Sequence, residues 1–562
     1  MTTFLLRIAI CATFTAILSM PAMAQHGGHA HGAAGSASNM PMDADHGLGT
    51  LSFPTSTQVP QAQEAFERGM RWLHLFEYDQ ARDAFVEAEK LDKDFALAYW
   101  GESLTNINGI WHMDDAAAGR AALAKLGPTP EARAAKAPTP REKAFLDTAE
   151  QLFGPGTIEE RQTRFLDSAT KLAHDYPDDD EAQLIRALAL FGADPKGRNA
   201  ANYAEAARLS RKVLAHNPQH GGAAHYLIHA TDDPTNAKEG LAAARALSGI
   251  GPMSSHAQHM TSHIFFSLGL WDDAIAANRE AIRIDEEERA KRKLPPARCG
   301  HYSDWLQYAY YQAGRVQEAR QVFADCVQDN GAIMAKAMLR PDLKADDLAM
   351  RQAELLDSLI DMHATALVES KDPSREAAIR IDTGNIGRFG GADLFARGYV
   401  AAMANDLPTA RTLLAQLQAM VAQPAAKEEY DPHLGERLSI QADMLQASID
   451  AGEGRMDPAI ARVREAAKRS DAIPFQFGPP RDVKPPHELA GELLMRQGKA
   501  AEALAEFDAS LESAPNRAQS LLGRARALKA MGDTARADAA MDVLQKQWHA
   551  ADATVVSQSA AR

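Results

Sequence analysis

Small and large apolar residues recur along much of this chain at the spacing of a helix rather than of a strand. In the stretch FEYDQARDAFVEAEKLD, Tyr78, Ala81, Phe85 and Ala88 lie three or four residues apart, which places them on one helical face. The same alternation returns further along the chain, centred on Ala237, Ala274, Ala319 and Ala503. Each copy follows a second amphipathic stretch, often with a glycine between the two, so the pattern predicts pairs of antiparallel helices.

These self-similar pairs cover most of residues 58–545. Because one helix pair cannot bury its apolar face alone, neighbouring pairs are expected to stack into an all-α solenoid with no sheet of consequence. The pattern resembles the tetratricopeptide repeat, a superhelical solenoid of antiparallel helix pairs. We divide the chain into an N-terminal array at 58–330, an irregular helical insert at 331–390, a C-terminal array at 391–545 and a flexible tail at 546–562.

The N-terminus has the pattern of an export signal. Arg7 supplies the positive flank, residues 8–20 are a short apolar run, and PAMA, ending at Ala24, is a small-residue cleavage site. We therefore predict a signal peptide at 1–24 and a periplasmic or secreted mature protein. Residues 25–57, rich in histidine, glycine and methionine, are expected to form a disordered linker. No later stretch is long and apolar enough to cross a membrane.

Composition narrows the classes of function. The 562 residues carry a formal charge of −15, which argues against nucleic acid as a partner. Aromatic residues make up only 6%, as expected for closely packed alanine-rich helices. No phosphate-binding loop, Rossmann glycine pattern or Gly-x-Ser-x-Gly elbow occurs, so nucleotide-dependent and serine-nucleophile enzymes find no support.

Histidines supply the strongest chemical signal. In SSHAQHMTSHIF, three of them are spaced so that they fall on one helical stripe. We measured how many residues each histidine lies before the anchor alanine of its own repeat: Ala237, Ala274 or Ala319. These distances place the histidines of three successive repeats in the first helix of each repeat. Most of them lie on the same stripe of that helix, the one expected to face inward. Counted in the same way, His225 is out of phase with that stripe and is a candidate to pack between units. The candidate metal ligands are His225, His229, His256, His259, His263 and His301.

Three interpretations of this histidine cluster remain open. Imidazoles from adjacent helices can hold a divalent transition metal, zinc or copper, on the concave face of the solenoid. Alternatively, they form a hydrogen-bonded ladder, or a polar wall that binds a protein or peptide in the groove. If a metal is present, a metal-dependent hydrolase is an alternative to a scaffold, with Asp232, Asp233 or Glu280 as a candidate base.

Further residues are candidates for contacts in the groove or for a covalent bond. His74 shares the inward phase, Trp305 follows His301, and the proline-stiffened FGPPRDVKPPHE leads into a helix at His487. We name as candidate groove contacts His74, Asp232, Asp233, Trp305 and His487. Cys299 and Cys326 lie at neighbouring ends of a predicted helical hairpin, so in an oxidising compartment we predict a disulfide between them, with two buried free thiols as the alternative.

Several stretches together resemble one family. GGAAHYLIHATDDP, HAQHMTSHIF and the late FGPPRDVKPPHELAGELL are similar to segments of exported bacterial tetratricopeptide-repeat proteins with histidine-rich helices. The chain departs from that family at INGIW, where Asn108 stands in place of an expected histidine. The resemblance implies the architecture more than an activity. We therefore expect a scaffold or interaction protein with a metal-binding histidine cluster, with a metallohydrolase and a metal-free peptide-binding module as alternatives.

Overall fold

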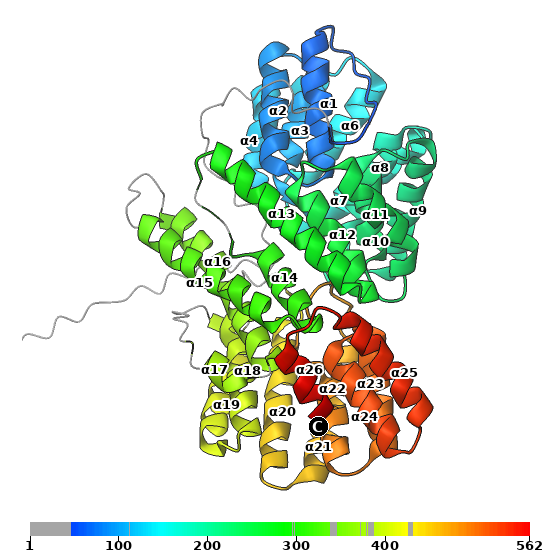
Figure 1. The fold of residues 1–562 in the computed structure, drawn as a ribbon. Coiled ribbons are helices and arrows are strands. Elements are labelled where there is room, and N and C mark those ends of the chain that lie inside the picture. Colours follow the sequence, from blue (N-terminus) through cyan, green and yellow to red (C-terminus); the bar gives the residue numbers. More distant parts are fainter. Residues whose placement is uncertain are drawn as a thin grey trace, which may run out of the picture.

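A computed structural model describes residues 47–337 apart from 112, 295 and 297, residues 345–377 apart from 371, and residues 379, 387–424 and 431–561. Over this part of the chain the protein is an all-α solenoid of antiparallel helix pairs, which confirms the predicted fold class. The N-terminal helices lie at one end (blue and cyan in Figure 1) and the C-terminal helices at the other (yellow to red). The predicted signal peptide and most of the predicted linker lie outside the described residues.

The helices of the first half include the pairs that carry the histidines. In chain order they are α1 (Pro60–His74), α2 (Tyr78–Leu91), α3 (Ala96–Leu104), η1 (Gly109–Trp111), α4 (Ala116–Leu126), α5 (Pro130–Ala134), α6 (Pro140–Leu152), α7 (Ile158–Asp175), α8 (Asp180–Phe191), α9 (Ala200–His216), α10 (Gly221–Thr231), α11 (Ala237–Ile250), α12 (Ser255–Leu268) and α13 (Trp271–Lys291).

The second half continues in the same manner. Its helices are α14 (His301–Gln312), α15 (Val316–Ala337), α16 (Ala345–Glu369), α17 (Pro373–Ala377), η2 (Gly387–Gly390), α18 (Gly391–Met403), α19 (Leu407–Val421), α20 (Leu434–Gly452), α21 (Met456–Asp471), α22 (Pro486–Arg496), α23 (Ala500–Ser513), α24 (Ala518–Ala530), α25 (Thr534–Gln547) and α26 (Ala553–Ala561). The strands are β1 (Ile107–Asn108) and β2 (Met113–Asp114), paired antiparallel. Within the described residues they are the whole of the sheet structure.

Small residues set the packing of the helix pairs. The anchors Ala237, Ala274, Ala319 and Ala503 are fully buried in the second helix of their pairs, α11, α13, α15 and α23. Because an alanine side chain is only a methyl group, the first helix of each pair can pack closely against the second helix at this position. This close packing explains why alanine recurs at the equivalent position of each pair. Gly269 and Gly314, with φ of 63° and 70°, make the tight turns into α13 and α15, a conformation that glycine adopts without strain.

Two terminal segments differ from the sequence expectation. Residues 47–57, the end of the expected disordered linker, lie against the first repeats, because Phe53 is buried between the rings of Phe66 and Phe145. The expected flexible tail at 546–562 contains α26 and is anchored by buried Trp548 and Val555. In both cases a few large apolar side chains hold a segment whose overall composition is polar.

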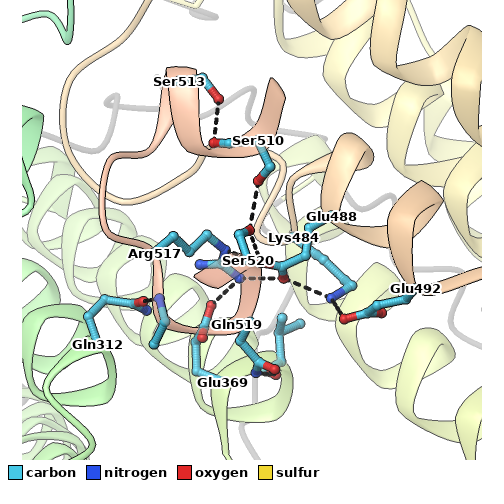
Figure 2. A network of polar contacts seen from close by, with 12 residues as sticks. Gln312, Glu369, Lys484, Glu488, Glu492, Ser510, Ser513, Arg517, Gln519 and Ser520 are labelled. Atoms are coloured by element: carbon cyan, nitrogen blue, oxygen red, sulfur yellow. Dashed lines mark hydrogen bonds and ion pairs between the residues drawn. The ribbon is translucent and has the colours of Figure 1, made fainter. Parts of the chain in front are cut away.

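A buried ionic network joins helices from the middle of the chain to helices near its C-terminus (Figure 2). Arg517, at the start of α24, forms ion pairs with Glu488 of α22 at 2.7 Å and Glu369 of α16 at 2.6 Å, and donates a hydrogen bond to Tyr308 of α14. Lys484 donates to Glu488 at 2.9 Å. Arg517 and Glu488 are fully buried, and their attraction, together with Lys484, keeps the pKa of Glu488 well below its usual value although burial alone would raise it.

Cys299 and Cys326 form a disulfide across the α14–α15 hairpin, with their Cα atoms 4.2 Å apart. Both cysteines are buried, and they pack in a small cluster with Phe323, Leu359 and Met362. The bond ties the segment that precedes His301 to the middle of α15. None of the described helices combines the length and the apolarity that a bilayer-spanning helix requires.

Candidate metal centre

Three neighbouring helices carry the six candidate histidines. His225 and His229 lie on α10, His256, His259 and His263 on α12, and His301 is the first residue of α14. Each of these is the first helix of its pair, as the repeat offsets predict. The rings form one continuous cluster, in which neighbouring ring centroids are 4.4 to 6.1 Å apart.

The cluster is buried, which corrects the expectation that it lines an open groove. His225 and His259 have no exposed surface and His256 is 9% exposed, whereas His301, at the start of α14, is half-buried. His225, expected to be out of phase, belongs to the same cluster. The histidines do face the concave side of the solenoid, as the repeat predicts. At this point, however, other segments cover the concave side and enclose them.

One covering residue comes from the turn between α1 and α2. Phe76 has a φ of 56°, a left-handed backbone conformation that is rare for a bulky residue. Its ring lies 4.6 Å from that of His225, 5.8 Å from that of His229 and 5.7 Å from that of His256. The unusual turn thus places an aromatic wall directly against the histidines.

The second cover comes from the proline-rich loop before α22. The ring of Phe477 lies 4.5 Å from that of His263 and 6.2 Å from that of His229. Next to it, Gly478 approaches the indole of Trp305 so closely that a Cβ would lie 2.6 Å from that ring. Trp305 itself stacks on His263, with centroids 4.5 Å apart. The C-terminal array therefore closes the histidine cluster of the N-terminal array.

His259 and His263 make the most informative contact. Their Nε2 atoms are 3.2 Å apart. The Nδ1 atom of His259 lies 2.7 Å from Asn278 Oδ1, and because Asn278 uses its amide nitrogen to donate to the carbonyl of Ala274, this oxygen is the acceptor. The Nδ1 atom of His263 lies 2.9 Å from a carboxylate oxygen of Asp232.

These partners fix the tautomers. Both Nδ1 atoms must carry the proton, because each faces an acceptor, so two neutral rings direct two Nε2 lone pairs toward each other. Burial lowers the pKa of both His259 and His263, which disfavours a bridging proton. A metal ion between the two nitrogens removes the conflict. Zinc–nitrogen bonds of 2.0–2.1 Å at a tetrahedral angle give a nitrogen separation of about 3.3 Å.

His225 and His229 have a related arrangement. His225 donates Nδ1–H to the carbonyl of His74 at 2.7 Å, and the Nδ1 of His229 lies 3.8 Å from Asp232. Among the described residues, the Nε2 atoms of His225 and His229 have no hydrogen-bond partner. Their possible ligand atoms and that of His256 all lie within 4.8 Å of one another.

Asp232 is fully buried at the end of α10, where it accepts from His263 and forms an ion pair with Arg198. Burial alone would raise the pKa of Asp232, but Arg198, His229 and His263 hold it well below its ordinary value. Asp233 instead pairs with Arg198 on the other side and accepts from the backbone of Asn236. Of the two aspartates proposed as contacts, Asp232 orients the histidines, whereas Asp233 holds the turn that precedes α11.

Glu77 fixes the start of the central helix, α12. One of its carboxylate oxygens accepts hydrogen bonds from the backbone N–H of His256 and from the hydroxyls of Ser254 and Ser255. A buried carboxylate at a helix N-terminus is favoured by the helix dipole. This contact from the first repeat holds the N-terminal turn of α12, which carries His256.

A third histidine group is of a different kind. His74 and His220 both direct Nε2 to the carboxylate of Glu181, at 2.7 and 3.0 Å. His220 accepts the backbone N–H of Ala223 with Nδ1, so its Nε2 carries the proton and is not a lone-pair donor. His74 is thus a structural residue here, hydrogen-bonded also to Tyr226, rather than a groove contact.

The remaining candidates lie elsewhere. His487 is half-buried between Glu506 and Asp471, at 2.7 and 3.1 Å, and these bonds raise its pKa; it takes no part in the cluster. Glu280 is engaged with Arg283 on the surface of α13, away from the histidines. Neither residue supports the role proposed from sequence.

Several residues of the centre were not anticipated. Asn278, Glu77 and Phe76 orient or cover the histidines, yet each stands in an ordinary helical or turn stretch. A local signal exists only for Asn278, a polar residue on the apolar face of its helix, between Ala274 and Ala281. The others depend on contacts that are remote in sequence.

Acidification is expected to destabilise the metal-free protein through His229. Burial lowers its pKa to about 4, so the unfolded chain binds a proton first as the pH falls below about 6.5, and stability is lost between these values. Between pH 7.5 and pH 5, urea unfolding of chelator-treated wild type should lose about 2 kcal/mol more than that of His229→Asn. His174→Asn, at an exposed position, is the control. Equal pH dependence of wild type and His229→Asn would contradict the burial effect.

No family model and no curated protein matches the sequence. Among solved structures, the fold is similar to the APC/C hetero-tetramer Cut9–Hcn1 (14% identity, 85% of this chain and 78% of that one, TM-score 0.34). It is also similar to human IFIT1 with PPP-AAAA (12%, 86% and 89%, 0.33) and to yeast Tom70 (13%, 90% and 96%, 0.30). At these scores the likeness says nothing of function. The helix pairs themselves define the class, a tetratricopeptide-like α-solenoid.

Proposed function

We propose that the protein is an exported scaffold of the tetratricopeptide type whose buried histidine cluster holds a divalent transition metal. The observation that carries this proposal is the 3.2 Å separation of the Nε2 atoms of His259 and His263, with both Nδ1 atoms engaged by acceptors. Metal-binding histidines commonly donate their other N–H to a carboxylate or carbonyl in this way. With His301, the ligand atoms lie within 4.8 Å of one another.

The three ligands His259, His263 and His301 favour zinc or copper, because imidazole nitrogen binds both ions well. Calcium and magnesium prefer oxygen ligands, which none of these three side chains supplies. The metal would connect α12 with α14 and so stiffen the solenoid where its two arrays meet. A stiff solenoid then presents its outer surfaces and remaining groove to a protein or peptide partner. Residues 1–24 supply the export signal in this proposal.

A metallohydrolase is the weaker alternative. Of the three carboxylates considered as a base, Asp232 is held by His263 and Arg198, Asp233 is held by Arg198 and the turn before α11, and Glu280 lies on the surface of α13. A base that activates water needs a position beside the metal and an unengaged oxygen. The geometry therefore supports a metal-stabilised scaffold better than a hydrolytic site.

Metal analysis of protein purified under native conditions without a histidine tag tests the proposal. Wild type should contain metal, and in excess zinc at 100 times the dissociation constant its stability should rise by about 2.7 kcal/mol. His259→Ala should lose most of that gain. Because His259 is buried, the metal-free variant is also expected to be less stable, so the gain on adding metal is the quantity to compare.

His487→Ala is the matched control, since His487 lies between two carboxylates outside the cluster. It should respond to metal as wild type does. Less than half an equivalent of bound metal in wild type, with no stabilisation by added zinc or copper, would leave a metal-free interaction module as the function.

A further inference from the structure

The six histidines form two geometrically distinct groups. His259, His263 and His301 make one set, and His225, His229 and His256 make another; within each set the ligand atoms lie within 4.8 Å of one another. We infer that each set is a separate three-histidine metal centre and that the two centres share the carboxylate of Asp232. This inference rests on the proposed metal-binding function and specifies its stoichiometry.

The second set meets the same chemical requirement as the first. His225 donates Nδ1–H to the carbonyl of His74, which leaves its Nε2 as a lone-pair donor. The Nε2 atoms of the fully buried His225 and the nearly fully buried His229 find no hydrogen-bond partner within the described part of the chain. Leaving such atoms unpaired in a protein interior is costly, and a metal ion satisfies both.

One ion does not account for both sets. Zinc in proteins takes four ligands, so six imidazoles exceed the coordination of one ion. Two centres of three histidines use every ring and leave a fourth position on each ion. The rings of His229 and His263, which belong to different sets, lie edge to face at 5.4 Å, so the two centres are neighbours.

Asp232 connects them. One of its oxygens lies 2.9 Å from Nδ1 of His263 and 3.8 Å from Nδ1 of His229, so one carboxylate hydrogen-bonds a ligand of the first centre and lies beside a ligand of the second. Its other oxygen is held by Arg198. A carboxylate behind a ligating histidine commonly changes metal affinity 10- to 100-fold, and here a single substitution should act on both centres.

The experiment is a zinc titration of the chelator-treated full chain, read by elemental analysis after gel filtration and by calorimetry. Wild type should bind two equivalents. His225→Gln and His259→Gln should each bind one, and the double variant none. Asp232→Asn should weaken both sites by 10- to 100-fold.

Two controls separate loss of a ligand from loss of structure. His220→Gln removes an equally buried histidine of the Glu181 group, and Asp233→Asn removes the other carboxylate bound to Arg198. Both should still bind two equivalents. Circular dichroism and the elution volume of each variant report whether it is folded, and the metal count is taken on the folded fraction.

The outcomes distinguish this inference from the proposed function. No bound zinc in wild type overturns both. One equivalent in wild type, or complete loss of zinc from either single variant, overturns the two-centre assignment while leaving a single metal site. Loss of an equivalent in His220→Gln shows that the Glu181 group is a site and also overturns the assignment. A weakening of only one site in Asp232→Asn overturns the shared carboxylate.

Discussion

Replacing Arg517 by methionine is expected to lower the free energy of unfolding by about 3–5 kcal/mol, measured by urea denaturation. The change removes a fully buried guanidinium that lies between Glu369 and Glu488, and these carboxylates remain in the interior (Figure 2). A buried charge without its partner is far more costly than the intact pair is stabilising. Lys484 compensates Glu488 only in part, because it is shared with Glu492.

The matched control is Arg524→Met on the same helix, α24. Arg524 pairs with Asp508 at 2.7 Å, but their side chains are 33% and 41% exposed, so the expected loss is at most about 1 kcal/mol. If Arg517→Met cost no more than Arg524→Met, the network would not hold the two arrays together. The loop that carries Phe477 ends at Lys484 in this network, so Arg517→Met should also loosen the cover over the histidines.

Loss of the disulfide is expected to lower the free energy of unfolding by about 3–4 kcal/mol, from the loop-closure entropy of its 27-residue separation. The double variant Cys299→Ser/Cys326→Ser, rather than a single one, avoids leaving a free thiol. Because Cys299 comes two residues before His301, zinc binding at the centre containing His301 should weaken as well. Urea unfolding and zinc titration measure the two effects.

Wild type treated with reductant is the control, and it should match the double serine variant. Titration of thiols in the unfolded, unreduced mature chain, which lacks residues 1–24 and with them Cys11, should find none. Two reactive thiols in that titration, or equal stability of wild type and the serine variant, would contradict a stabilising bond between Cys299 and Cys326.

The histidine cluster connects the fold to the proposed function. Each ligand-bearing helix is the first helix of its pair, and the repeat places such helices side by side, so imidazoles from α10, α12 and α14 meet without any special backbone. Left-handed backbone occurs in both covering segments, at Phe76 on the N-terminal side and at Val483 in the loop that carries Phe477, with φ of 56° and 65°. A regular array thus supplies the ligands, and two irregular segments exclude water from them.

The sequence by itself determined the helix pairs and the helices on which the histidines stand. Both follow from local periodicity, since buried Ala274 and Ala319 recur at a fixed distance from the histidines of their own units. The pairing of Cys299 with Cys326 was also within reach, because the two cysteines belong to a single predicted hairpin. These features depend on residues close together in the chain.

Only the tertiary structure decided that the cluster is buried and how its nitrogens are used. Phe477 reaches His263 from the C-terminal array, Glu77 reaches α12 from the first repeat, and Asp232 orients a histidine of the next unit. The repeat period of the sequence shows which way a side chain points within its own repeat. It does not show which distant segment covers that side chain or which acceptor receives its N–H hydrogen bond. Those contacts depend on the superhelical stacking of all the repeats, and they turn a predicted groove wall into an enclosed histidine centre.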